Sequence, residues 1–135
     1  MCVAFVVDSV SFYSKYNKNL LEQETDVHVQ EFHSPKDVLR AIESGNVPDV
    51  VVMDTILPFM KGSDLIEKIS NINNKIKFLV VTSDRRDINK IKHKHIPIME
   101  KPFLVSEFKN IFRKVRENGI GCVDDFYVSY EEGAA

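Results

Sequence analysis

Five short runs of apolar residues, each followed by a stretch with helical periodicity, constrain the fold of this chain more than any other feature. The runs cover residues 3–7, 27–32, 50–53, 78–81 and 96–99. Most are continuous rather than alternating, which is typical of strands covered by helices on both faces. Strands that alternate with helices predict βαβ units around a parallel sheet. The expected fold class is therefore α/β, with a doubly wound sheet of five strands.

The stretches between these runs carry helix signals. Ser34 followed by Pro35 predicts a helix start, and Gly45 predicts the end of the same helix. The segment 84–95 contains only Ile88 and Ile91 as apolar anchors among many charges, so we expect one short helix there. Apolar residues at helical spacing predict the inner faces of four helices. They are Phe12, Tyr16 and Leu20; Val38, Leu39 and Ile42; Leu65, Ile66, Ile69 and Ile72; and Leu104, Phe108, Ile111, Phe112 and Val115.

Of two segments that contain histidine, one predicts an exposed strand and the other is a candidate for a metal site. The run 27–32 contains His28, Gln30 and Glu31, which predicts a strand exposed on one side and therefore at a sheet edge. His93 and His95 form an HxH pair without a third ligand, a pattern that is more often a solvated surface than a metal site.

Length and composition indicate one domain without a global pull toward nucleic acid or membrane. The chain has 135 residues, with 18 Lys and Arg against 20 Asp and Glu. Cys2 and Cys122 form no CxxC motif, and no basic, apolar leader precedes the first strand, so a reducing cytoplasm is the expected location. No apolar run approaches the roughly 20 residues of a membrane helix. Nothing after the last predicted helix resembles a helix-turn-helix, so we expect no nucleic-acid binding.

Polar side chains stand at or just past the carboxyl ends of four of the predicted strands. They are Asp8, Asp54, Thr82 and Lys101. In an open α/β sheet, ligands bind outside these strand ends, where side chains from separate strands converge. Two carboxylates, a hydroxyl and an ammonium suit a phosphoryl group with a divalent metal. Simpler explanations exist for each residue alone: either Asp as a cap or turn residue, Thr82 as a β-branched strand residue, and Lys101 as an exposed charge.

The spacing around these residues resembles a known family. Asp54 is followed by Pro58 four residues later and Gly62 eight residues later, Thr82 is followed by a small residue, and Lys101 opens a Lys-Pro-Phe sequence. This pattern resembles the response regulator receiver domains of two-component signalling, the CheY-like family, over residues 2–117. The resemblance implies a flavodoxin-like (βα)5 fold with strand order 2-1-3-4-5, and a receiver domain covering residues 1–118.

The resemblance also implies a function. Asp54 would accept a phosphoryl group from a histidine kinase or phosphotransfer protein, Lys101 would pair with the phosphate, and Thr82 would donate its hydroxyl. Mg²⁺ would be held by Asp8, Asp54 and the backbone carbonyl of Ile56. The domain would be a signalling switch rather than an enzyme, catalysing at most its own phosphorylation and dephosphorylation.

The sequence departs from the family at three positions. Ser9 replaces one of two adjacent acids at the end of the first strand, so we expect weak Mg²⁺ binding and slow phosphorylation. Ile98 occupies the place of an aromatic residue that moves during switching. Ile56 occupies a place where a polar side chain can orient the hydrolytic water, which predicts a long-lived phosphate. A pseudo-receiver that signals by binding alone is therefore the main alternative.

A nucleotide-binding flavodoxin-like module is a third alternative, although the loop after the first strand lacks the glycines for close phosphate approach. The tail, residues 119–135, mixes acidic and aromatic residues: Asp124, Asp125, Phe126, Tyr127, Tyr130, Glu131 and Glu132. Either it is a linker or disordered end, or it docks on the basic surface formed by the short helix, the fifth strand and the last helix. In the family that surface contacts output partners or a second copy.

Overall fold

The computed structural model describes residues 1–84, 86, 88–92, 96–118 and 127–128. His93, His95 and most of the predicted tail lie outside the described residues. The strands are β1 (Cys2–Val7), β2 (Val27–Phe32), β3 (Val50–Met53), β4 (Ile56–Leu57), β5 (Met60–Lys61), β6 (Lys77–Thr82), β7 (Ile98–Glu100) and β8 (Tyr127–Val128). The helices are α1 (Ser11–Glu22), α2 (Pro35–Glu43), α3 (Gly62–Ile72), α4 (Ile88–Lys92) and α5 (Val105–Asn118).

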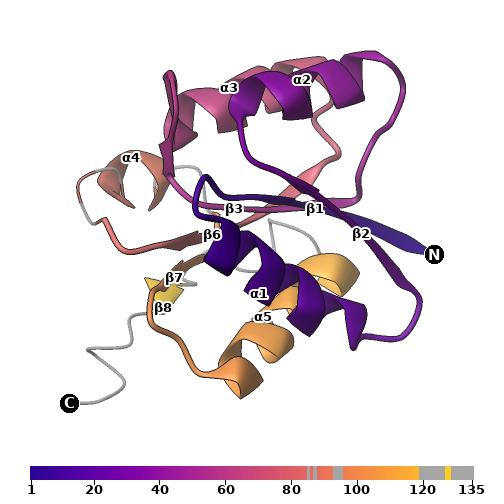
Figure 1. Cartoon of the computed structure of the whole chain (residues 1–135), viewed down its shortest axis with the longest axis vertical. Helices are drawn as coiled ribbons and strands as arrows, with labels where there is room; N and C mark the ends of the chain where they lie inside the picture. The colour runs from indigo at the N-terminus through magenta and orange to yellow at the C-terminus, as the bar shows by residue number, and fades with distance from the viewer. Residues whose placement is uncertain (85, 87, 93–95, 119–126, 129–135) are drawn as a thin grey trace.

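The main sheet is parallel, with strand order β2-β1-β3-β6-β7-β8. Its first five strands reproduce the predicted order 2-1-3-4-5, so the predicted α/β fold is confirmed. Helices α2 and α3 lie on one face of the sheet, and α1 and α5 lie on the other (Figure 1). Strand β2 lies at an edge, as its polar residues predicted. Among the described helices, none is both long and apolar enough to cross a membrane.

Alternate residues of the strands supply two separate cores. Because side chains alternate across a strand, Phe5 and Val7 face one side of the sheet, and Ala4 and Val6 face the other. The first core packs against α2, α3 and α4, where Ile88 and Ile91 are buried as predicted. The second packs against α1 and α5. Covered on both faces, β1, β3 and β6 are held rigidly, which fixes the positions of the residues at their carboxyl ends.

Local signals explain where several elements begin and end. The Ser34 side chain accepts a hydrogen bond from the Asp37 N–H at 3.4 Å, and Pro35 is the first residue of α2, so the predicted helix start is confirmed. After α2, Gly45 adopts a φ of 99°, a conformation that favours glycine. The predicted strand at 96–99 is shifted: the observed strand is Ile98–Glu100.

Three short strands were not predicted from the sequence. Strands β4 and β5 form a small antiparallel hairpin directly after Asp54, closed by Pro58 and Phe59. Phe59 has a φ of 66° and is fully exposed, at a turn position where glycine is usual. Strand β8 adds to the edge of β7, with Ile98 opposite Tyr127 and Met99 opposite Val128. Two residues of the tail thus pair with the sheet, whereas the rest of the tail lies outside the described residues, so its predicted docking on the basic surface stays a prediction.

Candidate functional site

The four polar residues predicted from the strand ends converge at one end of the sheet. Asp8 follows β1, Asp54 follows β3, Thr82 ends β6 and Lys101 follows β7. All four are buried, with exposed fractions of 1% for Asp8, 5% for Asp54, 0% for Thr82 and 9% for Lys101. The parallel register that aligns these strands is therefore what brings together residues far apart in the sequence.

Lys101 connects the two carboxylates. Its Nζ donates to Oδ2 of Asp8 and to Oδ2 of Asp54, both at 2.8 Å. The Lys101 backbone N–H donates to the Thr82 carbonyl at 2.8 Å, which anchors the lysine to the neighbouring strand. The buried cation thus compensates two buried anions that would otherwise repel each other. The explanation of Lys101 as an exposed surface charge is wrong.

The second oxygen of each carboxylate is held by backbone N–H groups. Oδ1 of Asp54 accepts from the N–H of Thr55 at 2.6 Å and from that of Ile56 at 3.2 Å. Oδ1 of Asp8 accepts from the N–H of Val10 at 2.9 Å, so Asp8 also orders the turn before α1. These bonds leave the two Oδ2 atoms facing each other across the Lys101 ammonium.

The Thr82 hydroxyl is bonded to Thr55 and Asp84 rather than to the Asp54 carboxylate. Thr82 Oγ1 lies 2.7 Å from Oγ1 of Thr55 and accepts the Asp84 N–H at 3.1 Å. Thr55 follows Asp54 immediately, so the hydroxyl pair ties the end of β6 to the residue beside the carboxylate.

Oxygen atoms of the kind that Mg²⁺ binds are present in the segments that follow β1 and β3. Oγ of Ser9 donates to the Ile56 carbonyl at 3.4 Å, so the loops after β1 and β3 touch here. The Asp8 and Asp54 carboxylates, the Ile56 carbonyl and the Ser9 hydroxyl are all hard oxygen ligands. These ligands are of the right chemical type for Mg²⁺, but they include only the two carboxylates named here. Among the described residues, no group of three or more His, Cys, Asp or Glu side chains is placed to hold a metal.

Close packing positions the loop that carries Asp54. A Cβ at Gly62, the first residue of α3, would come within 2.6 Å of the Thr55 Cα and 3.2 Å of the Asp54 carbonyl oxygen. The Gly62 N–H donates to the Thr55 carbonyl at 3.0 Å. Only glycine allows the helix start to approach this closely, which explains the glycine eight residues after Asp54.

Two residues near the site were not predicted from the sequence. The Tyr13 ring lies with its centroid 3.9 Å from the Lys101 Nζ, close enough for a cation–π contact. Thr55 supplies the hydroxyl that pairs with Thr82. Tyr13 lies on α1 beside Phe12 and Tyr16, whose predicted places on the inner face are wrong because both side chains are exposed. Thr55 directly follows Asp54. Neither position carries a signal in a single sequence.

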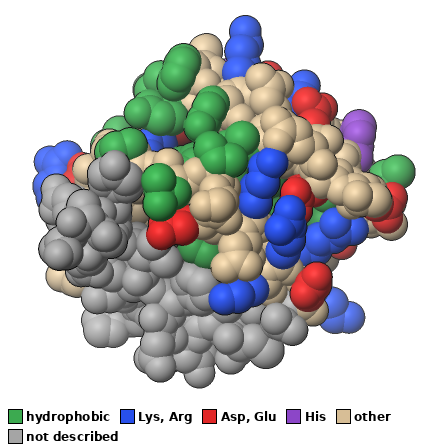
Figure 2. Space-filling model, turned by 90° about the horizontal axis from the view of Figure 1, so that it is seen from below, with side chains coloured by type: hydrophobic (Ala, Val, Ile, Leu, Met, Phe, Trp, Pro, Cys, Tyr) green, Lys and Arg blue, Asp and Glu red, His purple; other side chains and the backbone are tan. Residues whose placement is uncertain are grey.

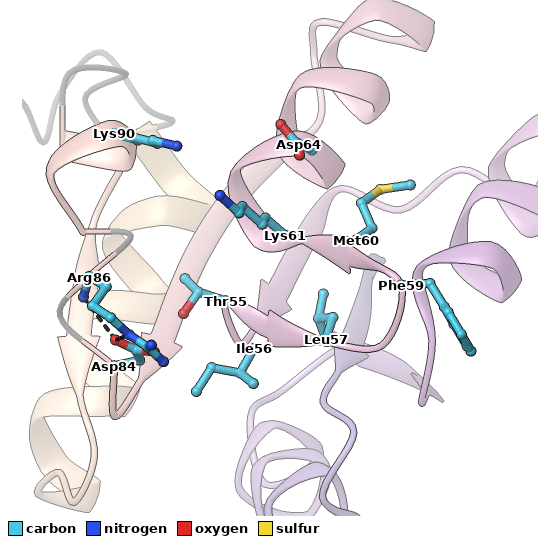
Figure 3. A pocket seen from close by; sticks show the side chains of 10 residues that line it. All are labelled: Thr55, Ile56, Leu57, Phe59, Met60, Lys61, Asp64, Asp84, Arg86 and Lys90. Atoms are coloured by element: carbon cyan, nitrogen blue, oxygen red, sulfur yellow. Dashed lines mark hydrogen bonds and ion pairs between the residues drawn. The ribbon is translucent and has the colours of Figure 1, made fainter.

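A pocket of about 590 Å³ opens beside the carboxylates rather than over them. It is lined by the β4–β5 hairpin, the start of α3 and the segment before α4, with Lys61 and Lys90 pointing toward one another across it (Figure 3). The Arg86 guanidinium is paired with Asp84 at the pocket wall and lowers the pKa of that carboxyl from 3.8 to about 2. Thr55 and Ile56 line the same pocket, so it borders the Asp54 loop.

Comparison with known proteins identifies this arrangement. The family model for the response regulator receiver domain matches residues 4–113. The chain belongs to the response regulator receiver domain family. The match spans most of the chain and contains all four converging residues, as the sequence pattern predicted. No curated protein matches.

Solved receiver domains share the fold. A CheY-like receiver domain protein from Methanospirillum hungatei is 19% identical, with a TM-score of 0.79 and coverage of 88% of this chain and 96% of that chain. The receiver domain of an HD domain-containing protein from Pseudomonas fluorescens is 21% identical, with a TM-score of 0.79 and coverage of 87% and 88%. CheY4 of Vibrio cholerae, a chemotaxis response regulator, is 17% identical, with a TM-score of 0.73 and coverage of 85% and 98%.

Membership in the family sets the class of activity. Receiver domains are signalling domains rather than typical enzymes, and they generally bind Mg²⁺ at their acidic pocket. They interact in general with histidine kinases and phosphotransfer proteins.

Proposed function

We propose that this receiver domain accepts a phosphoryl group on Asp54 and signals through the resulting change at the carboxyl end of its sheet. The observation that supports the proposal most strongly is the contact of one buried ammonium, that of Lys101, with both Asp8 and Asp54. A simple capping role for Asp54 does not require a lysine from a distant strand. A site that receives a phosphoryl group needs such a lysine, because charge neutralisation and positioning dominate phosphoryl transfer.

The proposed step forms one bond and breaks one. An oxygen of the Asp54 carboxylate attacks phosphorus, while the P–N bond of a phosphohistidine breaks and its electrons remain on the imidazole, which then takes up a proton. Asp54 Oδ1 is held by two backbone N–H groups, so the side chain is oriented before the attack. Lys101 already contacts Oδ2 and would pair with the incoming phosphoryl oxygens. Thr82 would turn its hydroxyl from Thr55 toward the phosphoryl group.

Mg²⁺, when bound, would offset the charge of the phosphoryl oxygens. Asp8, Asp54 and the Ile56 carbonyl would hold it, with Ser9 in the position where the family usually has a second acid. Because Ser9 brings no charge and Lys101 already occupies one oxygen of each carboxylate, we expect weak affinity for the ion. The exposed Ile56 side chain offers no polar group to orient water, so we expect the phosphorylated form to persist.

The surface around the site suits a protein phosphodonor. Exposed apolar side chains in the elements that follow Asp8 and Asp54 include Val10, Phe12 at the start of α1 and Ile56 on β4. Tyr16 on α1 and Leu104 and Val105 at the start of α5 are also exposed, and Figure 2 shows a group of hydrophobic side chains on the face seen from below. Phe12 stacks on Tyr16, and Tyr16 contacts Phe103 beside the Lys101 loop. A histidine kinase or phosphotransfer protein, acting in the cytoplasm, is the proposed partner for this surface.

The mass of the intact chain tests the proposal. Incubation with Mg²⁺ and acetyl phosphate should add one phosphoryl group to the chain, and Asp54→Asn should abolish the addition. Asp64→Asn is the matched control. Asp64 is an exposed carboxylate near the loop that carries Asp54, and Lys101 pairs with Asp8 and Asp54 instead. A chain that gains no phosphoryl group from acetyl phosphate, phosphoramidate or a kinase would contradict the proposal.

A pseudo-receiver is the second candidate, and the sparse metal site favours it. Among the described residues, the carboxylates that contact Lys101 are those of Asp8 and Asp54, and Ser9 supplies a hydroxyl where the family usually has a further acid. In this alternative, the fold would bind its partner without phosphorylation. Ser9→Asp restores the missing charge, so phosphorylation that appears only in this variant would support the pseudo-receiver.

A further inference from the structure

Strand β8 adds a sixth strand to the sheet, beyond the five strands of the expected fold. It follows β7 through α5 and pairs parallel to β7, but α5 lies on the face covered by α1, so this crossover has the opposite hand to those through α2, α3 and α4. Without β8, β7 would be the edge of the sheet. An edge strand presents backbone N–H and C=O groups that can pair with another chain.

The hydrogen bonds of β7 show which of its backbone groups face this edge. The Val80 N–H donates to the Pro97 carbonyl at 3.0 Å, and the Lys101 N–H donates to the Thr82 carbonyl at 2.8 Å. In a parallel ladder, alternate residues turn both backbone groups to the same neighbour. Pro97, Met99 and Lys101 therefore face β6, whereas Ile98 and Glu100 face outward to β8.

The register assigns a specific residue of β8 to these groups. Val128 lies opposite Met99, between the two outward-facing residues. Its N–H is thus directed at the Ile98 carbonyl, and its carbonyl at the Glu100 N–H. The N–H of Tyr127 points away from β7 in the same geometry. Pairing through β8 therefore depends on the backbone of Val128 and not on the N–H of Tyr127.

We infer that the β7 edge is a strand-binding surface and that its occupant is the C-terminal segment of the same chain, docked through β8. The segment 119–126 tethers β8 to α5, so docking is intramolecular and has a high effective concentration. A partner or second copy that adds a strand to this edge must first displace the tail. Strand β8 thus covers the outer edge of β7.

The strand-binding edge reaches the proposed phosphorylation site. Glu100 immediately precedes Lys101, whose Nζ contacts Asp8 and Asp54. This relevance to signalling rests on the proposed function, but the docking of β8 does not. The two can fail separately, because docking is measurable in the unphosphorylated chain.

Amide hydrogen exchange of the full chain, resolved by NMR, tests the inference. Val128→Pro removes the N–H directed at Ile98 and should accelerate exchange of the Glu100 amide about tenfold or more. Tyr127→Pro is the matched control, since the N–H that it removes faces away from β7, and it should leave that exchange rate unchanged. The Met99 amide faces β6 and should stay equally protected in all three chains, which reports that the sheet is intact.

The outcomes separate clearly. Fast exchange of Glu100 in Val128→Pro with normal exchange in Tyr127→Pro supports the docking of β8. Equal exchange of Glu100 in the parent chain and Val128→Pro overturns it, as does equal acceleration by both prolines. If exchange follows the docking pattern while no phosphoryl group is ever gained, the inference holds and the proposed function fails.

Discussion

Lys101 is a buried cation that compensates two buried anions. The residue is 9% exposed, and its Nζ lies 2.8 Å from Oδ2 of Asp8 and 2.8 Å from Oδ2 of Asp54. Removing one partner from a buried ionic group leaves uncompensated charge, which is much more costly than losing an exposed ion pair.

We therefore predict that Lys101→Met lowers the free energy of unfolding by about 3 kcal/mol, measured by urea denaturation at neutral pH. Lys90→Met is the control, because Lys90 is exposed, and it should change stability by less than about 0.5 kcal/mol. Equal stability of the two variants would mean that Lys101 does not hold the carboxylates together.

The hydroxyl pair of Thr55 and Thr82 makes a second prediction at this scale. Thr82→Val removes one hydroxyl from a buried contact of 2.7 Å and leaves the other without its partner. We expect a loss of about 1 to 2 kcal/mol in the free energy of unfolding. The double variant Thr55→Val with Thr82→Val should lose less than the sum of the single variants, since no orphaned hydroxyl remains. Strict additivity would contradict the contact.

Single residues also show where prediction from the sequence succeeds and where it does not. Asp8, Asp54, Thr82 and Lys101 were predictable because each stands at or just past the end of an apolar run, and parallel strands end at the same edge. Tyr13 was not, because a contact between α1 and the loop after β7 depends on the tertiary position of both. The bonding of Thr82 to Thr55 rather than to Asp54 depends on rotamers, which sequence does not specify.

At the scale of the elements, the start of α3 controls the Asp54 loop. Gly62→Ala should lower the free energy of unfolding by about 2 kcal/mol and slow phosphorylation of Asp54, because the added methyl group would lie 2.6 Å from the Thr55 Cα. Thermal or urea unfolding, together with the rate of mass gain, measures both effects.

Gly45→Ala provides the comparison. Gly45 has a φ of 99°, so alanine is strained there, but no atom lies within 4 Å of the added methyl group. This variant should lose stability, by about 1 kcal/mol, without any change in phosphorylation. A similar effect of both variants on phosphorylation would show that Gly62 acts only through overall stability.

The end of α1 is fastened to α5 by Glu24 and Arg113. Arg113 Nε donates to Glu24 Oε1 at 2.5 Å, and this hydrogen bond lowers the pKa of Glu24 from 4.5. A carboxyl whose pKa is lower in the folded state stabilises the fold above its unfolded pKa, and this contribution is lost as the pH falls through the folded value.

Glu24→Gln should therefore lower stability by about 0.5 kcal/mol at pH 7, a modest figure because the Arg113 side chain is 55% exposed. The difference from the parent chain should shrink as the pH falls below 4.5, which urea denaturation across a pH series can follow. Glu22→Gln, an exposed neighbour on α1, should have little effect at any pH. A difference that grows toward acid pH would contradict the sign.

For the whole molecule, five strands, their order and their covering helices followed from apolar runs and from the family pattern. The hairpin of β4 and β5 did not, because Phe59 adopts a backbone conformation that its residue type does not signal. Strand β8 did not either, because two residues in an acidic and aromatic tail carry no strand period. Both additions lie beside the site: one borders Asp54, and the other lies against the strand before Lys101.

Asp54 is the residue on which the proposed switch depends, because it is the one expected to carry the phosphoryl group. The most direct measurement is to phosphorylate the full chain with acetyl phosphate and Mg²⁺, digest it under acidic conditions and locate the added phosphoryl group by tandem mass spectrometry. The account predicts one modified residue, Asp54, on the loop between β3 and β4. A phosphoryl group on any other side chain, or none on Asp54 while Lys101 remains in contact with it, would contradict the account.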